Sequence, residues 1–226
     1  MIVPSILSGG GLDTSAAHLG EAEVRDVARD RYGLDGAFRR FDTEKDDTFR
    51  IRTAGGEAYV LKIANPAERP VEIDFQIDLL RHIEQRAPEV PVPRVLADHA
   101  GGFRSLYRAS DGTDRIVRVV SYLEGTPLDS TTSSPAERER VGEILARLRF
   151  ATADFRHPGE DRVLAWDVQH LMQLAPLLSG VDDADQRRRL ETALDRFAKV
   201  TSGLDRLRRQ VLHNDFSRSN IVVDHA

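Results

Sequence analysis

The hydrophobic pattern of the chain changes once along its length, and this change constrains the fold most strongly. Strand-like runs, such as Phe49–Arg52 and Ala58–Ile63, are concentrated before residue 121. After residue 134, apolar residues recur every three or four positions, as in the stretch 141–148. Alternation or short β-branched runs are typical of strands, and a spacing of three to four is typical of helices. We therefore expect an α+β chain, with a strand-rich half followed by a helical half.

The strand-rich half is predicted to contain five strands and one long helix. The pair Gly55–Gly56 supplies the positive φ that a tight hairpin needs. Ile73, Ile77 and Leu80 mark the apolar side of the helix, which must end near Pro88 because proline lacks a backbone N–H. The expected strands are 38–42, 49–52, 58–63, 102–108 and 115–120, with the helix between the third and fourth.

We expect three segments along the chain. Residues 1–20 form a flexible lead-in, 21–121 the strand-rich lobe, and 122–226 the helical lobe. Ser134, Pro135 and Glu137 have the pattern of a capping box and predict a helix start. Two further helices are expected at 164–178 and 183–200, the second with Leu190, Leu194 and Phe197 facing inward.

Composition excludes several classes of function. The 226 residues include 32 Lys and Arg against 37 Asp and Glu, for a formal net charge of −5, and no cysteine. The lack of cysteine rules out a disulfide scaffold and a thiol nucleophile. The acidic balance argues against broad nucleic-acid binding, and no apolar run approaches the ~18 residues that span a bilayer. With no basic leader typical of secretion, we expect a cytoplasmic protein without nucleic-acid or membrane partners.

The sharpest chemical signal is the run from His213 to Asn220, in which Asp215 and Asn220 are separated by four residues. Phosphoryl transfer to an alcohol needs a carboxylate that orients the hydroxyl and accepts its proton, and an oxygen ligand for Mg²⁺. Asp215 and Asn220 could fill these two roles, with His213 as a brace for the loop. The same residue types are ordinary turn formers, so an ordinary loop is the alternative.

A second signal is Lys62, which lies among apolar residues in an expected strand. A lysine in such a run is costly to bury without an anionic partner. The alternative is a lysine that points to water from an edge strand. The order of the two signals, a strand lysine followed ~150 residues later by the Asp215 loop, is what a kinase-type site requires.

The chain resembles the aminoglycoside phosphotransferase (APH) family of small-molecule kinases. The segments that carry the resemblance are 59–63, 118–128 and 213–220, within a matching region of residues 30–226. Leu61–Pro66, Asp74–Gln76 and Leu164–Asp167 are similar to the hydroxylysine-kinase-like branch, which includes domains fused to aminotransferases. The resemblance implies a protein-kinase-like two-lobed fold with a five-stranded antiparallel sheet, a helix, and a helical lobe that is incomplete here.

The resemblance also implies roles for individual residues. Lys62 would bind the α- and β-phosphates of ATP or GTP, Asp215 would be the catalytic base, and Asn220 a Mg²⁺ ligand. Backbone groups of Ser121 and Leu123 would meet the nucleobase. The phosphate loop would be the turn at 43–48, which has no Gly-x-Gly-x-x-Gly sequence.

Two departures from the family pattern stand out. The helix residue that should pair with Lys62 falls on Gln76, with Asp74 or Glu72 as carboxylate substitutes; we expect Asp74. The family also has a further Asp in an Ile-Asp-Phe-like segment, and the printed chain ends at Ala226 before one occurs. We therefore expect a truncated kinase with impaired turnover, and self-association through the incomplete helical lobe.

The leading expectation is a nucleotide-dependent phosphotransferase whose partner is a small-molecule hydroxyl acceptor. An amino-alcohol or amino acid, hydroxylysine-like, is the acceptor that the resemblance favours. One alternative is a catalytically inactive nucleotide- or partner-binding remnant of a larger kinase. Another is an aminoglycoside phosphotransferase.

Overall fold

The computed structural model describes residues 18–43, 46–161, 163–164, 167–204 and 206–224. Most of the expected lead-in, and Trp166, lie outside this range. Contacts divide the chain into two compact units, Ala16–Glu160 together with Gln210–Ala226, and Asp161–Arg209. The expected boundary at residue 121 does not separate these units. The helix at 135–151 and the residues from 210 onward both group with the sheet. The division into lobes at 121 stays a prediction.

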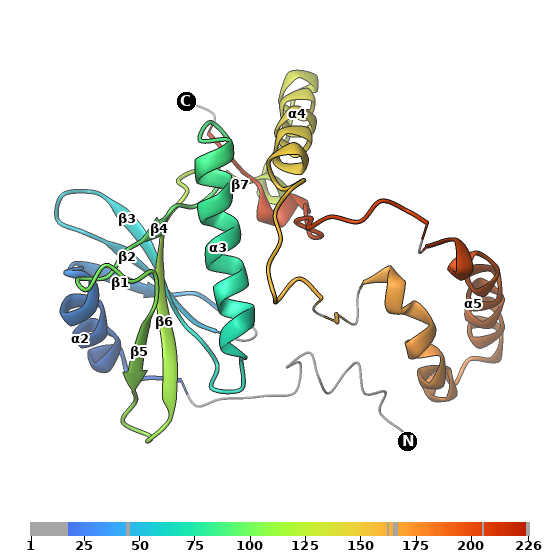
Figure 1. Cartoon of the computed structure of the whole chain (residues 1–226), viewed down its shortest axis with the longest axis horizontal. Helices are drawn as coiled ribbons and strands as arrows, with labels where there is room; N and C mark the ends of the chain where they lie inside the picture. The colour runs from blue at the N-terminus through green and yellow to red at the C-terminus, as the bar shows by residue number, and fades with distance from the viewer. Residues whose placement is uncertain (1–17, 44–45, 162, 165–166, 205, 225–226) are drawn as a thin grey trace. The chain divides into compact units, whose positions relative to one another are not determined.

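The first unit is built on an antiparallel sheet with the order β1-β2-β3-β6-β4, in which β5 also pairs with β6 (Figure 1). The strands are β1 (Ala37–Arg40), β2 (Asp47–Arg52), β3 (Ala58–Ile63), β4 (Val95–Leu96), β5 (Ser105–Arg108) and β6 (Asp114–Ser121). β4 and β5 pair with different parts of β6, so the sheet has six strands, one more than the five expected. The short strand β4 is the one that the sequence did not predict.

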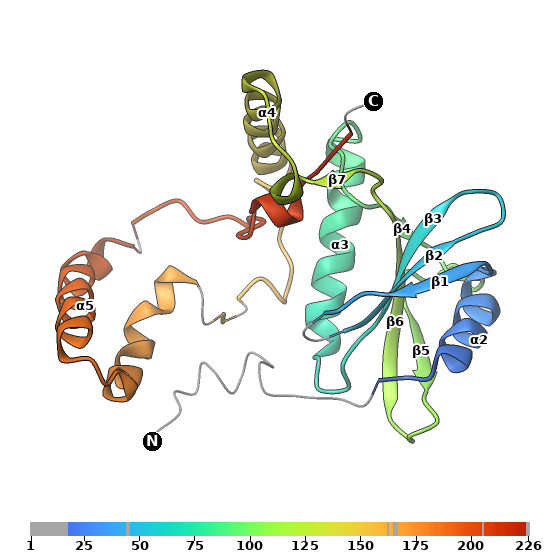
Figure 2. The same cartoon turned by 180° about the vertical axis from the view of Figure 1, so that it is seen from behind.

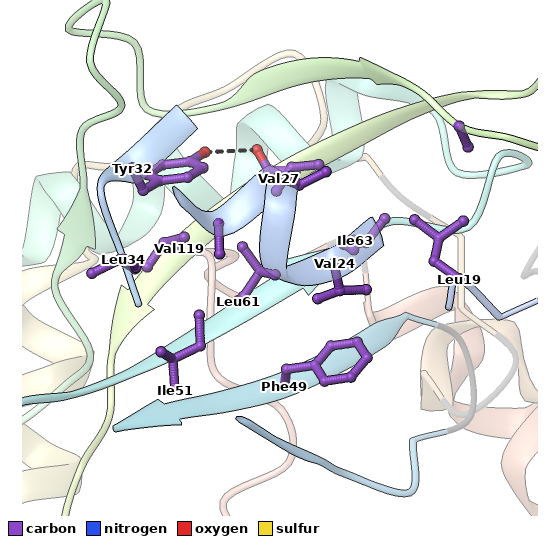
Figure 3. Packing of buried hydrophobic residues seen from close by; sticks show 13 residues of the cluster. Leu19, Val24, Val27, Tyr32, Leu34, Phe49, Ile51, Leu61, Ile63 and Val119 are labelled. Atoms are coloured by element: carbon purple, nitrogen blue, oxygen red, sulfur yellow. Dashed lines mark hydrogen bonds between the residues drawn. The ribbon is translucent and has the colours of Figure 1, made fainter. Parts of the chain in front are cut away.

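Two helices lie on opposite faces of this sheet (Figures 1 and 2). Helix α2 (Glu21–Tyr32) contributes four buried residues to the larger core, where they meet apolar side chains of β2, β3 and β6 (Figure 3). The Tyr32 hydroxyl donates a hydrogen bond to the Val117 carbonyl over 3.0 Å. Helix α3 (Pro70–Arg86) packs Ile73 and Ile77 against Ile116 on the other face. Alternation along each strand therefore sorts side chains between the α2 face and the α3 face.

Helix α4 (Pro135–Ala151) begins with the expected capping box, in which Ser134 and Glu137 bond each other's backbone N–H groups. Its last turn packs Leu148 and Ala151 against Ile83 of α3. Phe216, from the segment that follows the second unit in sequence, also packs on this cluster. The apolar contact with α3 and α4 thus fixes the C-terminal segment to the first unit.

A short strand pair closes the same segment. Strand β8 (Val222–Val223) pairs with β7 (Thr126–Pro127), and the Leu128 N–H donates to the Ile221 carbonyl over 2.8 Å. The turn before β7 contains Gly125 at φ +145°, a conformation that only glycine adopts readily.

The second unit contains the 3-10 helix η2 (Val168–Gly180) and helix α5 (Ala184–Leu204). No described residue of α5 is fully buried; Leu194 and Phe197 are half-buried and Leu190 is 45% exposed, so the expected inward packing is met only in part. No helix in the described part of the chain has the length and apolar character needed to cross a membrane.

The core position of Leu61 predicts a large stability effect. Leu61 is fully buried between α2 and the sheet. We expect Leu61→Ala to lower the free energy of unfolding by about 2–5 kcal/mol in urea titrations, because it leaves a cavity. The control Leu106→Ala, at a residue of β5 that is 59% exposed, should change it by less than about 0.5 kcal/mol. Equal losses in the two variants would contradict this packing.

The conformation of Gly125 leads to a second prediction about stability. Alanine at this position should destabilise the protein, whereas alanine at a matched control glycine should stabilise it. A Cβ on Gly125 would lie 3.0 Å from the Val223 carbonyl oxygen, at a φ that side chains avoid. Gly125→Ala should therefore destabilise the β7–β8 pair by more than about 1 kcal/mol, measured by thermal unfolding. Gly142→Ala, inside α4 with open space around it, should stabilise the protein by about 0.5–1 kcal/mol. A neutral Gly125→Ala variant would show that the turn tolerates a side chain.

Candidate functional site

The structure brings Asp215 and Asn220 into direct contact. The Asn220 amide nitrogen donates to Asp215 Oδ2 over 2.7 Å and to the Asp215 backbone oxygen over 3.0 Å. The turn η3 (Arg218–Asn220) returns the chain on itself, so that side chains five residues apart meet. Because Asn220 bonds one oxygen of the carboxylate, the Asp215 side chain is held in one orientation.

Contacts on both sides hold this loop in place. Phe216 lies in the apolar cluster of α3 and α4, and its ring makes an edge contact with His213 at 5.8 Å between centroids. The Arg218 guanidinium donates to the Leu128 carbonyl over 2.8 Å, and the Thr152 hydroxyl donates to the Val211 carbonyl over 2.9 Å. The predicted role of His213 as a brace agrees with its contact with Phe216.

The backbone beside Asp215 has an unusual conformation. Asn214 has φ +60°, and it is the one non-glycine residue with positive φ in the described part of the chain. This left-handed region disfavours most side chains, although asparagine tolerates it better than most. Such conformations persist where the surrounding contacts impose them, and they are concentrated at functional sites. The strained residue turns the chain immediately before the carboxylate.

Lys62 lies on β3, on the α3 face of the sheet. The alternative of an edge-strand lysine is wrong, because β3 is paired with β2 on one side and β6 on the other. Its side chain is 35% exposed, and Nζ lies 3.8 Å from Asp46 Oδ2. Burial lowers the pKa of Lys62 below its ordinary value, and the charge of Arg118 lowers it further. Asp46 and Glu68 act in the opposite direction.

Arg118 is a site residue that sequence reasoning missed. The register of β3 and β6 puts Lys62 directly opposite Arg118. Arg118 is almost fully buried, and its guanidinium donates to Asp46 over 2.9 Å and to the Gln76 amide oxygen over 3.0 Å. Its buried Nη1 atom has no hydrogen-bond partner among the described residues. The sequence did show Arg118 as a charged residue within the run 115–120. Only the pairing of the strands shows that it lies opposite Lys62.

The expected pairing of Asp74 with Lys62 was wrong. Asp74 forms an ion pair with Arg104 instead, and among the described residues Lys62 pairs with Asp46. Residues two apart on a helix point to different sides, so Asp74 and Gln76 cannot share a face. The helical spacing did identify Gln76 correctly as the residue that faces the sheet at this level.

Ser121 and Leu123 were both predicted to contact the nucleobase through their backbone groups, and the structure treats them differently. Ser121 ends β6, and its backbone N–H donates to the Arg94 carbonyl over 2.8 Å while its hydroxyl accepts from the Arg94 N–H over 2.9 Å. The next N–H, of Tyr122, donates to the Ala58 carbonyl over 3.0 Å. The Ser121 N–H is therefore used within the sheet. Leu123 follows β6 and is half-buried, and its contact with a nucleobase stays a prediction.

An apolar hollow of about 260 Å³ lies beside the loop and is lined in part by Leu145, Leu148, Leu212 and Phe216. Leu145 and Leu212 are 42% and 55% exposed. Exposed apolar surface of this kind is compatible with the expected self-association, which stays a prediction.

The described residues fit an anion better than they fit a metal ion. They include no group of three or more His, Asp or Glu residues arranged to hold a metal. Asp215 and Asn220 offer one carboxylate and one amide, which is an incomplete set for Mg²⁺ without further ligands. By contrast, Lys62 and Arg118 place two positive charges beside Asp46, and the charge of Glu68 also acts on Lys62. A pair of cations of this kind suits an anionic group.

Comparison with known proteins places this geometry in context. Hydroxylysine kinase of Danio rerio is 26% identical over 221 residues, which cover 92% of this chain and 61% of that protein. Homoserine kinase of Paraburkholderia phymatum is 29% identical over 186 residues, which cover 80% of this chain and 53% of that protein. The chain thus spans between about half and three fifths of the length of these curated relatives.

A solved structure shows the same fold. The microcompartment-associated aminopropanol kinase matches with a TM-score of 0.67 at 18% identity, over 91% of this chain and 66% of that one. The expected α+β, protein-kinase-like fold is confirmed. A model of the phosphotransferase enzyme family (APH) matches residues 38–226. The chain therefore belongs to the phosphotransferase enzyme family.

Proposed function

We propose that this chain carries the nucleotide-binding sheet and the catalytic loop of a kinase that phosphorylates a hydroxyl group of a small amino-alcohol or amino acid. The donor is ATP or GTP, and hydroxylysine-like compounds are the first acceptors to test. The contact between Asp215 and Asn220 carries the proposal, because it presents one free carboxylate oxygen on a braced loop. The relatives named hydroxylysine kinase, homoserine kinase and aminopropanol kinase support this class of acceptor.

Each residue then has a defined task. The Lys62 ammonium binds phosphate oxygens of the nucleotide as a positive charge. The Asp215 carboxylate accepts a hydrogen bond from the acceptor hydroxyl and takes its proton as the oxygen attacks the γ-phosphorus. The bond from that phosphorus to the β–γ bridging oxygen breaks, and ADP or GDP leaves. Asn220 keeps that carboxylate in one orientation through its amide N–H. Asn220 would also offer its amide oxygen to Mg²⁺, which would neutralise charge on the phosphates.

The incomplete set of metal ligands favours one further candidate. A module that binds nucleotide or a partner without turnover would keep Lys62 and Arg118 but transfer no phosphate. The two candidates differ in one measurement, which is phosphate transfer at saturating nucleotide and Mg²⁺.

Replacement of Asp215 tests the catalytic proposal. In assays with ATP or GTP, Mg²⁺, and hydroxylysine, homoserine or aminopropanol as acceptor, Asp215→Asn should lower turnover by about 10²–10⁴-fold because proton transfer is lost. Nucleotide affinity, measured by calorimetry, should change little. Asp30→Asn, at an exposed residue of α2, is the matched control. Unchanged turnover in Asp215→Asn would end its assignment as the base, and binding without turnover in the unmodified chain would support the inactive module.

The lowered pKa of Lys62 predicts a pH dependence. Phosphate oxygens bind the protonated ammonium, so nucleotide affinity should fall as the pH rises through a pKa that lies below that of an ordinary lysine. Calorimetric titrations with ATP across the alkaline range measure this. Lys62→Arg, which stays charged throughout, should show no such fall. The same alkaline fall in Lys62→Arg would assign the titration to another group.

A further inference from the structure

Two positive charges face each other at the centre of the sheet. Lys62 and Arg118 are directly opposed across β3 and β6, on the face covered by α3. Like charges at such positions repel, and burial strengthens the repulsion. Glutamine at position 76 bonds to Arg118 but brings no negative charge. The ammonium of Lys62 therefore needs a carboxylate from elsewhere to stay charged and in place.

Asp46 supplies that carboxylate from the loop before β2. Its Oδ2 lies 2.9 Å from Arg118 and 3.8 Å from Lys62, so a single oxygen lies within ion-pair distance of both cations. The neighbouring Asp47 points the other way, because successive strand residues alternate between faces. Asp47 accepts the Leu19 N–H over 2.7 Å and pairs with Arg40. Of these two adjacent aspartates, Asp46 therefore pairs with cations on the α3 face of the sheet, and Asp47 makes its contacts on the opposite face.

We propose that Asp46, fixed by Arg118 and Gln76, is a positioning residue that keeps Lys62 charged and aimed at the nucleotide phosphates. The proposal rests on the proposed function and assigns to a loop carboxylate the task that a glutamate on the helix would otherwise perform. Arg118 links the loop to the helix, since one guanidinium bonds Asp46 and Gln76 together. Its Nη1 atom has no hydrogen-bond partner among the described residues, so it could donate to a further anion.

Relocation of the carboxylate tests this role. Asp46→Asn should weaken ATP binding about tenfold or more in calorimetry, because Lys62 then faces Arg118 without a counter-charge. The double variant Asp46→Asn with Gln76→Glu restores a carboxylate from the helix side beside Arg118 and should recover most of the affinity. Asp30→Asn is again the control. Circular dichroism confirms that each variant is folded.

A pH profile separates positioning from a purely structural role. The charged groups that act on Lys62 are Arg118, Asp46 and Glu68. Without Asp46, the alkaline fall in ATP affinity should begin at lower pH, and Gln76→Glu should move it back. Arg118→Gln removes the repelling charge and should move the fall to higher pH. This third variant tests the same electrostatics if Asp46→Asn does not fold.

The possible outcomes are distinct. If the unmodified chain binds no ATP, the proposed function fails and this inference fails with it. If ATP binds and Asp46→Asn binds it equally well or more tightly, Asp46 is a bystander or a competitor of phosphate, and only this inference is overturned. Failure of Gln76→Glu to restore affinity in a folded Asp46→Asn chain would also overturn it.

Discussion

The opposed positive charges of Lys62 and Arg118 are the constraint on which the site depends. Strand register places them across from each other, and nothing in the backbone could separate them without shifting a whole strand. Charges in this position must be balanced. Asp46 lies within ion-pair distance of both cations, and Glu68 also acts on Lys62. The proposed function would bring the nucleotide phosphates beside this pair of cations.

Helix α3 connects this charged centre to the catalytic loop. Its first half packs Ile73 and Ile77 on the sheet, and between them Gln76 bonds Arg118. Its last turn packs Ile83 against α4 and the cluster that receives Phe216. The same rigid element thus contacts the Lys62–Arg118 face of the sheet and the loop of Asp215. Apolar packing sets where the loop lies, and hydrogen bonds set how its side chains are oriented.

Local sequence patterns predicted much of this arrangement. Contacts between residues far apart in the sequence, which depend on how the strands and loops come together, were not predicted. The strand 58–63, the capping box at Ser134 and the Asp215–Asn220 motif are local, so spacing and residue type were sufficient. Asp46 and Arg118 are 72 residues apart, and no sequence period relates them. The expectation of Asp74 failed because residue type was given more weight than helical phase, and the phase pointed to Gln76.

The pairing of β7 with β8 joins residues 126–127 to 222–223, so the segment 161–209 is inserted between two parts of one compact unit. The sheet and α3 can assemble from residues that precede position 122. The loop with Asp215 is added only when the residues around 222 have left the ribosome, since β8 and Phe216 fix it there. During synthesis, the sheet that carries Lys62 and Arg118 can thus form before the loop of Asp215 and Asn220 has a partner strand to hold it.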